Sequence, residues 1–464
     1  MPGVTSSDHP SKLGGYDFYR KVLGSPKYVV APMVDQSELA WRKLSRRYGA
    51  QLAYTPMINA KMFAEGARRG FREQQFNITH GEEGGPEDRP LIVQFCGNNP
   101  AQLLASARVV EPYCDAVDIN LGCPQDIARR GHYGSFLQDE WDLIYDIINM
   151  LHRNLSIPVT AKFRVFPTVE KTVEYARMLE RAGAQILTCH GRVREQRGHQ
   201  SGLADWDKIR AVKEAVSIPV FANGNILFHS DIERCLAATG ADAVMSAEGN
   251  LYNPALFYPA PFHSLPAADD ESSTPGASTS TAIAMASSGH HPPLTALARE
   301  YLEIVKRQRT PTVLSAVKGH LFKLLRPALA KETDLRAQLG RAQIPRTNRP
   351  EVWAPYEEIL ALLEERTERD ALAAEGRPLE ALVTIDEATG LPLLPHWLAQ
   401  PYFRPLPPAA AATESDEEAA ELSKDGPAGS KRGHPERTLE PEVAKRVKLE
   451  TVASVGAEEV AVAG

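Results

Sequence analysis

The chain has 464 residues, which exceeds one ordinary domain, and its 43% hydrophobic and 24% charged residues are typical of a globular protein. No apolar run approaches the ~20 residues of a membrane-spanning helix, so we expect no membrane partner. The five cysteines are an odd number without short paired spacings, which argues against a disulfide framework or a zinc site and favours a reducing compartment.

The net charge of −7 is distributed unevenly along the chain. Residues 408–464 contain 7 Lys/Arg and 12 Asp/Glu and are poor in aromatic residues, which predicts a disordered acidic tail. Residues 294–345 contain 10 Lys/Arg and 4 Asp/Glu, so this segment is distinctly basic. A basic segment of this kind indicates a polyanionic partner such as nucleic acid.

Short apolar runs predict eight β-strands, at residues 28–33, 51–54, 91–95, 116–119, 159–163, 185–189, 219–222 and 242–245. Helical spacing predicts helices between most of them, at residues 37–47, 100–110, 141–153, 168–181, 206–215 and 230–238. The strands are continuously apolar, as expected for a parallel sheet covered by helices, and eight such units fit an α/β fold of the (β/α)₈ TIM-barrel class. A doubly wound open sheet is the alternative, but no Gly-x-Gly-x-x-Gly motif follows an early strand.

Composition divides the chain into five parts. Residues 1–26 form a lead-in, 27–262 the barrel, 263–293 a flexible insertion, 294–407 a basic helical domain with an extension, and 408–464 the disordered tail. The helical domain should contain one long helix at 294–325 and a charged helix at 350–374. Two basic clusters in the tail, Lys431-Arg432 and Lys445-Arg446-Val447-Lys448, resemble a two-part nuclear import signal, so we expect the protein in the nucleus, the cytoplasm or both.

A barrel enzyme keeps its catalytic groups at the carboxyl ends of its strands. Cys123 follows the fourth predicted strand on a turn between Gly122 and Pro124. Taken alone, a free cysteine is more often a small buried hydrophobic residue. Polar or glycine-containing segments at the other strand ends favour a catalytic thiol instead: Gln94, Asn120, Lys162, Arg164, His190, Asn223-Gly224-Asn225 and Ala247-Glu248-Gly249.

The loops after the seventh and eighth strands are where barrels commonly bind phosphate. Both carry glycines, whose backbone N–H groups can approach an anion closely. A phosphorylated cofactor is therefore the expected occupant, with Lys162 supplying positive charge against an anionic ring and Gln94 contacting a ring edge.

Several segments together resemble the tRNA-dihydrouridine synthase family: Ala31-Pro32-Met33, Asn120-Leu121-Gly122-Cys123-Pro124, Lys162-Phe163-Arg164, Cys189-His190-Gly191-Arg192 and Asn223-Gly224-Asn225. The resemblance covers residues 28–257. Residues 247–250, 317–323 and 400–402 are similar to the eukaryotic branch that acts on D-loop uridines 16 and 17. Many relatives carry arginine where this chain has Glu248, which leaves backbone N–H groups to hold the phosphate.

The resemblance implies an FMN-dependent reductase fed by NADPH or NADH, which transfers hydride from FMN to C6 of a uracil. Cys123 would protonate C5, since a thiol of pKa ~8.5 is mostly protonated at neutral pH. The implied cofactor-binding residues are Pro32, Met33, Val34, Gln94, Lys162, His190, Asn223, Gly224, Asn225, Ala247 and Glu248. The implied substrate-binding residues are Asn120, Arg164, Arg192, Lys318 and Lys323.

Basic loops near the predicted site favour tRNA as the partner of a monomeric protein. The loop after the sixth strand carries Arg192, Arg194, Arg197 and His199, and the loop after the fourth carries Arg129, Arg130 and His132. Two alternatives stay open. A small-molecule FMN oxidoreductase of the dihydroorotate dehydrogenase kind would not need these basic segments, and a non-catalytic RNA-binding protein would not need Cys123.

Overall fold

A computed structural model describes residues 12–66, 70–198, 201–258, 290–342, 350–387 and 389–403. Most of the predicted flexible insertion, His199, the acidic tail and both basic clusters of the nuclear import signal lie outside the described residues. Within the described ranges, no helix is both long enough and apolar enough to cross a membrane.

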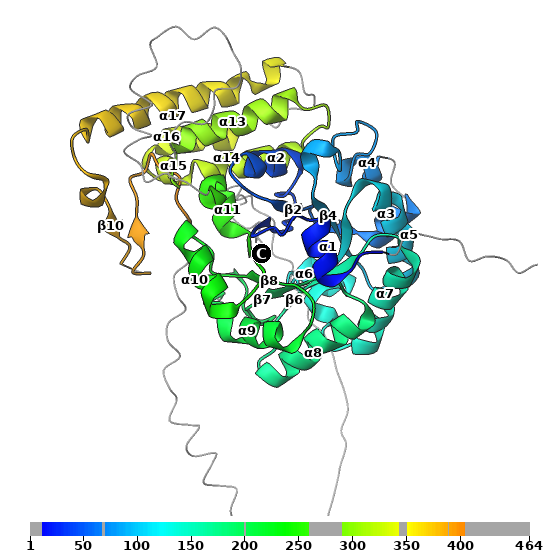
Figure 1. The fold of residues 1–464 in the computed structure, drawn as a ribbon. Coiled ribbons are helices and arrows are strands. Elements are labelled where there is room, and N and C mark those ends of the chain that lie inside the picture. Colours follow the sequence, from blue (N-terminus) through cyan, green and yellow to red (C-terminus); the bar gives the residue numbers. More distant parts are fainter. Residues whose placement is uncertain are drawn as a thin grey trace, which may run out of the picture. The chain divides into compact units, whose positions relative to one another are not determined.

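Parallel strands close into a barrel surrounded by helices (Figure 1). β1 pairs with both β9 and β2, and the pairing of β2 with β4 closes the ring. The short strand β3 (Ile58–Asn59) runs beside β4. The barrel strands are β1 (Tyr28–Val30), β2 (Leu52–Tyr54), β4 (Leu91–Cys96), β5 (Ala116–Leu121), β6 (Val159–Arg164), β7 (Leu187–His190), β8 (Val220–Asn223) and β9 (Ala243–Ser246). The predicted (β/α)₈ barrel is confirmed.

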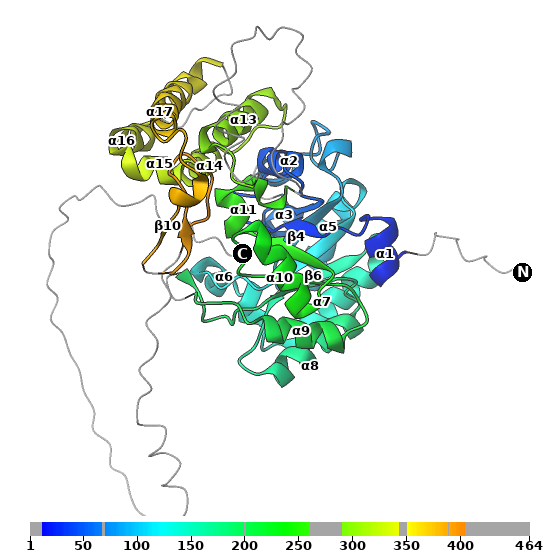
Figure 2. The ribbon, with the colours of Figure 1, turned by 60° about the vertical axis from the view of Figure 1, so that its left-hand side comes forward.

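Amphipathic helices cover the barrel (Figures 1 and 2). In α7, for example, Ile144, Ile147, Ile148 and Leu151 form one buried stripe at helical spacing. The main helices are α2 (Leu39–Arg47), α5 (Pro100–Val110), α7 (Trp141–Asn154), α8 (Val169–Ala182), α9 (Trp206–Ala215) and α10 (His229–Thr239). Shorter helices are α1 (Gly15–Lys21) within the predicted lead-in, α3 (Ala60–Glu65), α4 (Phe71–Gln75), α6 (Asp126–Gly131) and α11 (Glu248–Tyr252).

The carboxyl ends of six strands lie one or two residues beyond the predicted ends. β4 continues through Cys96 and β5 through Leu121, and the other four end at a polar residue: Arg164 in β6, His190 in β7, Asn223 in β8 and Ser246 in β9. An apolar run stops where the polar residues begin, but the backbone pairing continues past that point. Four of the predicted site residues therefore lie on strands and not on the loops that follow them: Asn120, Arg164, His190 and Asn223.

The predicted single helix at 294–325 was wrong, because it is two helices, α13 (Leu294–Arg307) and α14 (Leu314–Leu324). Pro311 lacks an N–H and disfavours helical backbone at the preceding Thr310. Gln308 closes the break, since its Nε2 donates to the Thr310 carbonyl at 2.7 Å and to Thr312 Oγ1 at 2.8 Å. Further elements are α15 (Arg326–Lys331), α16 (Thr333–Arg341), α17 (Ala354–Ala373) and the hairpin of β10 (Thr384–Ile385) and β11 (Pro392–Leu393).

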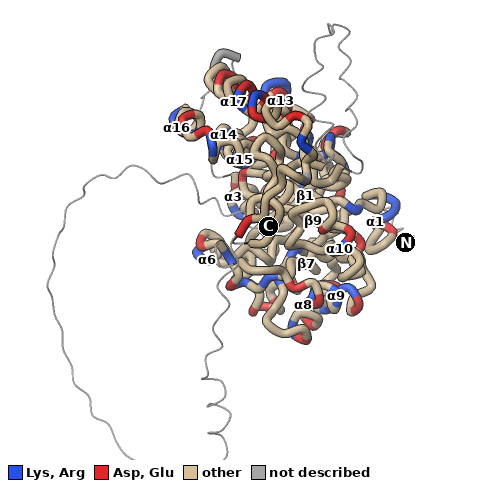
Figure 3. The backbone as a smooth tube through the Cα atoms, turned by 90° about the vertical axis from the view of Figure 1, so that its left-hand side faces the viewer, with Lys and Arg blue, Asp and Glu red and all other residues tan. Residues whose placement is uncertain are grey.

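Much of the basic charge at 294–345 is paired within the helices. Helix α17 carries six Asp/Glu and two Arg, and Figure 3 shows both signs interspersed on α13 and α17. Lys306 Nζ lies 2.6 Å from the Glu357 carboxylate, and Lys331 pairs with Asp370. These helices therefore present far less free positive charge than the composition of one segment suggested.

The segment before the tail, which sequence analysis described only as an extension, packs on the folded body. The Ala399 N–H donates to the Pro292 carbonyl at 2.9 Å, and the Arg326 guanidinium lies over the Tyr402 ring at 3.9 Å. His291, which we had expected in the flexible insertion, is buried, and its Nδ1 lies 2.8 Å from the Ala399 carbonyl.

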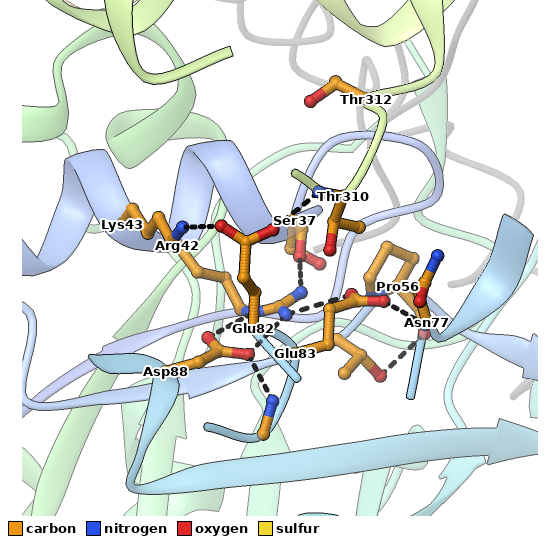
Figure 4. Close-up of polar contacts among 12 residues, drawn as sticks. Ser37, Arg42, Lys43, Pro56, Asn77, Glu82, Glu83, Asp88, Thr310 and Thr312 are labelled. Carbon is orange, nitrogen blue, oxygen red and sulfur yellow. Dashed lines mark hydrogen bonds and ion pairs between the residues drawn. The ribbon is translucent and has the colours of Figure 1, made fainter. Parts of the chain in front are cut away.

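A buried arginine attaches the loop at residues 77–88 to α2 (Figure 4). Arg42 donates to both carboxylate oxygens of Asp88, at 2.8 and 2.6 Å, to Glu83 at 3.2 Å and to the Ser37 carbonyl at 2.8 Å. The side chains of Arg42 and Asp88 are completely buried, so each charge is stabilised in the interior by the other.

The neighbouring Glu82 connects this loop to the helical region (Figure 4). Its carboxylate accepts a hydrogen bond from Lys43 at 3.2 Å and another from the backbone N–H of Thr310 at 2.6 Å. The turn between α13 and α14 is thereby held against the barrel.

A second junction joins the helical region to the end of the barrel. His320 of α14 stacks on Trp41 of α2 with ring centroids 4.1 Å apart, and its Nε2 lies 3.0 Å from Glu38. Tyr301 of α13 donates to the same carboxylate at 2.8 Å. Trp41 Nε1 donates to Asn250 of α11 at 2.8 Å. This cluster of Glu38, Trp41, Asn250, Tyr301 and His320 is called the aromatic junction below.

We expect Arg42→Met to lower the free energy of unfolding by about 3–5 kcal/mol, because Asp88 and Glu83 would stay buried without their cation. Urea denaturation measures the change. Lys21→Ala is the control, since the exposed Lys21–Asp17 pair should be worth no more than about 0.5 kcal/mol. Equal losses in the two variants would contradict the expectation.

Candidate active site

Parallel register brings the predicted site residues together inside the barrel. Residues paired across parallel strands point to the same side of the sheet. Asn120 of β5 lies beside Lys162 of β6. Arg164 of β6 lies beside His190 of β7, which lies beside Asn223 of β8. All of these except Asn120, which is partly buried, are buried side chains, so five separate predictions converge on one site.

Hydrogen bonds fix the turn that carries Cys123. Asn120 Oδ1 accepts from the N–H groups of Gly122 at 3.1 Å and Cys123 at 2.9 Å. On the other side, the Cys123 carbonyl accepts from the Ser135 N–H at 3.1 Å and hydroxyl at 2.9 Å. Gly134 has φ +67°, and a Cβ there would lie 2.7 Å from the Cys123 carbonyl oxygen. The turn therefore needs glycine at this neighbouring position.

Cys123 is only 2% exposed and lies in an apolar cluster with Cys96, Ala128 and Tyr133. Burial raises the pKa of Cys123, although a hydrogen bond from Gln125 and the charges of Arg164 and Lys162 oppose the shift. The thiol is therefore protonated at neutral pH and is suited to donate a proton.

Lys162 is buried without a counter-ion. Its ammonium makes no hydrogen bond or ion pair to the described residues. Burial, followed by the neighbouring Arg164, lowers the pKa of Lys162 to about 7, and Asp118 opposes this shift. An anionic ligand next to this ammonium would raise its pKa again and stabilise its charged form.

His190 is held as a neutral imidazole. Burial and then the nearby charges of Arg164 and Lys162 lower the pKa of His190 well below its ordinary value. Arg192 Nη1 lies 3.2 Å from His190 Nε2. A guanidinium only donates, so Nε2 is the acceptor and Nδ1 carries the ring proton.

The loop after β8 has a backbone conformation that favours glycine and brings it close to neighbouring segments. Gly224 has φ +115° and Asn225 has φ +63°, and a Cβ at Gly224 would lie 2.7 Å from Ala204. Asn223 donates to the Met245 carbonyl at 3.0 Å, but its buried Oδ1 has no partner within the described residues. Ala247 and Glu248, at the end of β9, begin α11. Pro32, Met33 and Val34 follow β1 at the same end of the barrel.

The predicted substrate-binding arginines and lysines are engaged by the protein itself. Arg192 donates to the carbonyls of Ser201 and Gly202 and to Asn225 Oδ1, so it orders its own loop. Lys318 Nζ donates to the carbonyl of Gly340 at 2.6 Å, at the end of α16. Their roles in RNA binding stay predictions, and any such role would compete with these contacts.

Two further candidates lie closer to the expected cofactor and catalytic loop. Arg164 donates to the Gly122 carbonyl at 2.9 Å, but its Nη2 makes no hydrogen bond to the described residues. Burial lowers the pKa of Lys323, and the charge of Glu248 at the start of α11 opposes the shift. Since α14, which carries Lys323, contacts α11, Lys323 lies near the expected phosphate loop.

Comparison with known proteins identifies the family. Residues 29–352 match the sequence profile of dihydrouridine synthase (Dus). This chain belongs to the dihydrouridine synthase family. The Schizosaccharomyces pombe tRNA-dihydrouridine(16/17) synthase [NAD(P)(+)] is 44% identical over 401 residues, which cover 85% of this chain and 92% of that protein.

Two other relatives of the family distinguish its branches. The mouse tRNA-dihydrouridine(16/17) synthase [NAD(P)(+)]-like protein is 46% identical over 396 residues, covering 85% of this chain and 72% of the mouse protein. The human tRNA-dihydrouridine(20a/20b) synthase [NAD(P)+]-like protein is 39% identical over 232 residues, covering 49% of this chain and 70% of the human protein. The similarity to the 16/17 relatives thus extends over much more of this dihydrouridine synthase.

Sequence analysis missed one charged residue inside the barrel. Asp118 is completely buried on β5, and it accepts hydrogen bonds from Gln94 of β4 at 2.8 Å and Thr160 of β6 at 2.6 Å. Burial raises the pKa of Asp118 to about 6. A carboxylate within an otherwise apolar strand was the signal that could have identified it.

A lysine pKa near 7 makes the stability of the cofactor-free protein depend on pH. Above pH 7 and below about 10.5, the unfolded chain binds one more proton at Lys162 than the folded protein, so stability rises with pH. Relative to Lys162→Met, we expect the wild-type free energy of unfolding to rise by about 1.4 kcal/mol per pH unit between about pH 7.5 and 9.5. Urea denaturation at several pH values checks this, and a constant difference would mean that Lys162 stays charged.

Proposed function

We propose that this chain is a tRNA-dihydrouridine synthase that reduces uridines 16 and 17 of the D-loop, with FMN as cofactor and NADPH or NADH as reductant. The observation that carries the proposal is the thiol of Cys123, which burial keeps protonated on a turn fastened beside Lys162 and Arg164. The extent of the match to relatives named for positions 16 and 17 supports the choice of uridines.

The residues present fit a flavin mononucleotide. Buried polar groups without partners normally find them in a ligand or in water, and Asn223 Oδ1 is of this kind. Lys162 is a buried residue whose ammonium makes no hydrogen bond to the described residues. A Cβ at Gly249 would lie 2.2 Å from the Ile226 carbonyl oxygen, so glycine at this position lets the loops after β8 and β9 pack closely against each other. Lys162 and Gln94 would hold the polar edge of the ring, Pro32-Met33-Val34 its face, and the loops after β8 and β9 the phosphate.

Proton delivery is the part of the reaction that the chain performs itself. When bound, FMN supplies the hydride that is added to C6 of the uracil. Cys123 Sγ donates its proton to C5, which completes the saturation of the C5–C6 bond. The positive charges of Lys162 and Arg164 then stabilise the thiolate that remains. The uracil must leave the RNA stack to reach this buried thiol.

Absorbance of the purified protein tests the proposal. We expect a flavin spectrum that bleaches with NADPH and recovers on addition of unmodified tRNA, with formation of dihydrouridine. A colourless protein that binds tRNA would favour a non-catalytic RNA-binding role. A flavoprotein that ignores tRNA but is reoxidised by a small pyrimidine would favour a small-molecule oxidoreductase.

Loss of the proton donor should separate the two half-reactions. We expect Cys123→Ala to reduce dihydrouridine formation by roughly 10²- to 10⁴-fold, while NADPH still bleaches the flavin at close to the wild-type rate. Cys114→Ala is the matched control, because this buried thiol contacts the Val110 carbonyl and lies outside the site. Equal activity of Cys123→Ala and wild type would contradict the assignment.

Arg129 and Arg130 of α6 are the exposed cations next to the catalytic turn that make no hydrogen bond or ion pair to described residues. If each neutralises one tRNA phosphate, Arg129→Ala or Arg130→Ala should lower the slope of log affinity against log salt by roughly 0.7–0.9. Titration of tRNA binding at several salt concentrations measures this. Arg210→Ala, on α9, should leave the slope unchanged.

A further inference from the structure

A chain of hydrogen bonds connects the buried carboxylate of Asp118 to the catalytic turn. Gln94 Nε2 donates to Asp118 Oδ2 at 2.8 Å, and Asn120 Nδ2 donates to Gln94 Oε1 at 2.8 Å. Asn120 Oδ1 in turn accepts from the backbone N–H groups of Gly122 and Cys123, at 3.1 and 2.9 Å. This series of hydrogen bonds therefore passes through two side-chain amides. The oxygen and the NH₂ group of each amide could in principle exchange places.

The two ends of this chain dictate the orientation of both amides. An ionised carboxylate only accepts hydrogen bonds, so Gln94 must turn its NH₂ group toward Asp118. Its oxygen then faces Asn120, which must supply an NH₂ group in reply. Peptide N–H groups only donate, so Asn120 must turn its oxygen toward the catalytic turn. One arrangement satisfies every group, and it is the arrangement present.

We propose that Asp118 is a positioning residue: through Gln94 and Asn120 it sets the direction of the hydrogen bonds that hold the Cys123 turn. The inference rests on the proposed role of Cys123 as proton donor. The side chain of Asp118 accepts hydrogen bonds from Gln94 and Thr160, so its hydrogen-bonded connection to the turn runs through the two amides.

The environment of Asp118 argues against a role in stability alone. Its side chain is completely buried and forms no ion pair within the described residues. A buried charge without a counter-ion costs folding free energy that an apolar residue at this strand position would avoid. An acceptor facing the NH₂ group of Gln94 is what the orientation of Gln94 requires.

Replacing the donor that faces Gln94 at residue 120 by an acceptor should break the series of hydrogen bonds. Replacing the acceptor at residue 118 by a donor as well should restore it. Asn120→Asp still accepts from the turn but presents a second acceptor to Gln94, which then faces carboxylates on both sides. Adding Asp118→Asn supplies a donor at the far end, so that Gln94 can turn over and donate to residue 120. Independent structural roles would instead make the two substitutions additive.

The reactivity of the Cys123 thiol is measured first, because it does not depend on flavin or tRNA. We expect iodoacetamide to alkylate Cys123 of the Asn120→Asp protein roughly 10-fold faster than wild type at neutral pH, since residue 120 loses its hydrogen bond to Gln94 and no longer holds the turn in place. The Asp118→Asn/Asn120→Asp protein should return to within about 2-fold of wild type. Mass spectrometry of the Cys123 peptide gives the rates.

The matched control keeps the acceptor at Asp118 but removes another neighbour. Thr160→Val deletes the hydroxyl that donates to Asp118 without offering a donor to Gln94, so Thr160→Val/Asn120→Asp should stay as reactive as Asn120→Asp. An equal rescue by Thr160→Val, or none by Asp118→Asn, would overturn the proposal.

The pH profile gives a second readout. Once protonated, either Asp118, whose pKa burial raises to about 6, or the carboxyl group that Asn120→Asp introduces can donate to Gln94. As the pH falls, the alkylation rate of the Asn120→Asp protein, divided by its thiolate fraction, should therefore fall back to the wild-type value. The Asp118→Asn/Asn120→Asp protein should not show this fall. Restored reactivity without tRNA reduction in the double variant, alongside an inactive wild type, would reject the proposed function and leave the positioning role intact.

A fold check accompanies each variant by circular dichroism. If Asn120→Asp does not fold, Asp118→Asn and Asp118→Asn/Thr160→Val replace it. The Thr160 hydroxyl can rotate to accept from the amide that Asp118→Asn introduces, so the single variant should behave as wild type. The double variant lacks that acceptor, and its Cys123 should be alkylated roughly 10-fold faster. Identical rates in these two proteins would overturn the proposal.

Discussion

Parallel pairing in register around the closed barrel is the constraint on which the site depends. Lys162, His190 and Asn223 come from three different strands, and each points inward because its partner on the next strand does. Side chains alternate between the two faces of a strand, so a slip of one residue would turn each of these groups toward the surrounding helices. The pairing of β2 with β4 closes the ring, and the register of the closed barrel directs these polar side chains into its interior.

The barrel interior holds charges at a cost to stability. Burial lowers the pKa of Lys162 and raises that of Asp118. Neither side chain forms an ion pair with the described residues. Perturbed groups that cluster in this way mark sites of chemistry more often than sites of packing. The barrel keeps them because helices and the Arg42 network stabilise the same scaffold from outside.

The eight strands and their order could be predicted because buried parallel strands are continuous apolar runs between turn residues. The strand ends could not, since Arg164, His190 and Asn223 are polar but still paired. Their grouping followed from topology, whereas Asp118 was missed because it lies within a run that is otherwise apolar. Charge counting also failed for the helical region, because composition does not reveal that acidic residues of α17 pair with basic residues elsewhere.

The aromatic junction has a consequence for how substrates are selected. Stacking of His320 on Trp41, with Tyr301 and His320 sharing Glu38, joins α13 and α14 directly to α2 of the barrel. If RNA binds to those helices, the distance between its binding surface and the thiol of Cys123 would be set by this junction. The enzyme would then select a nucleotide by its distance along the RNA from the bound segment, and the RNA would have to bend to reach the thiol.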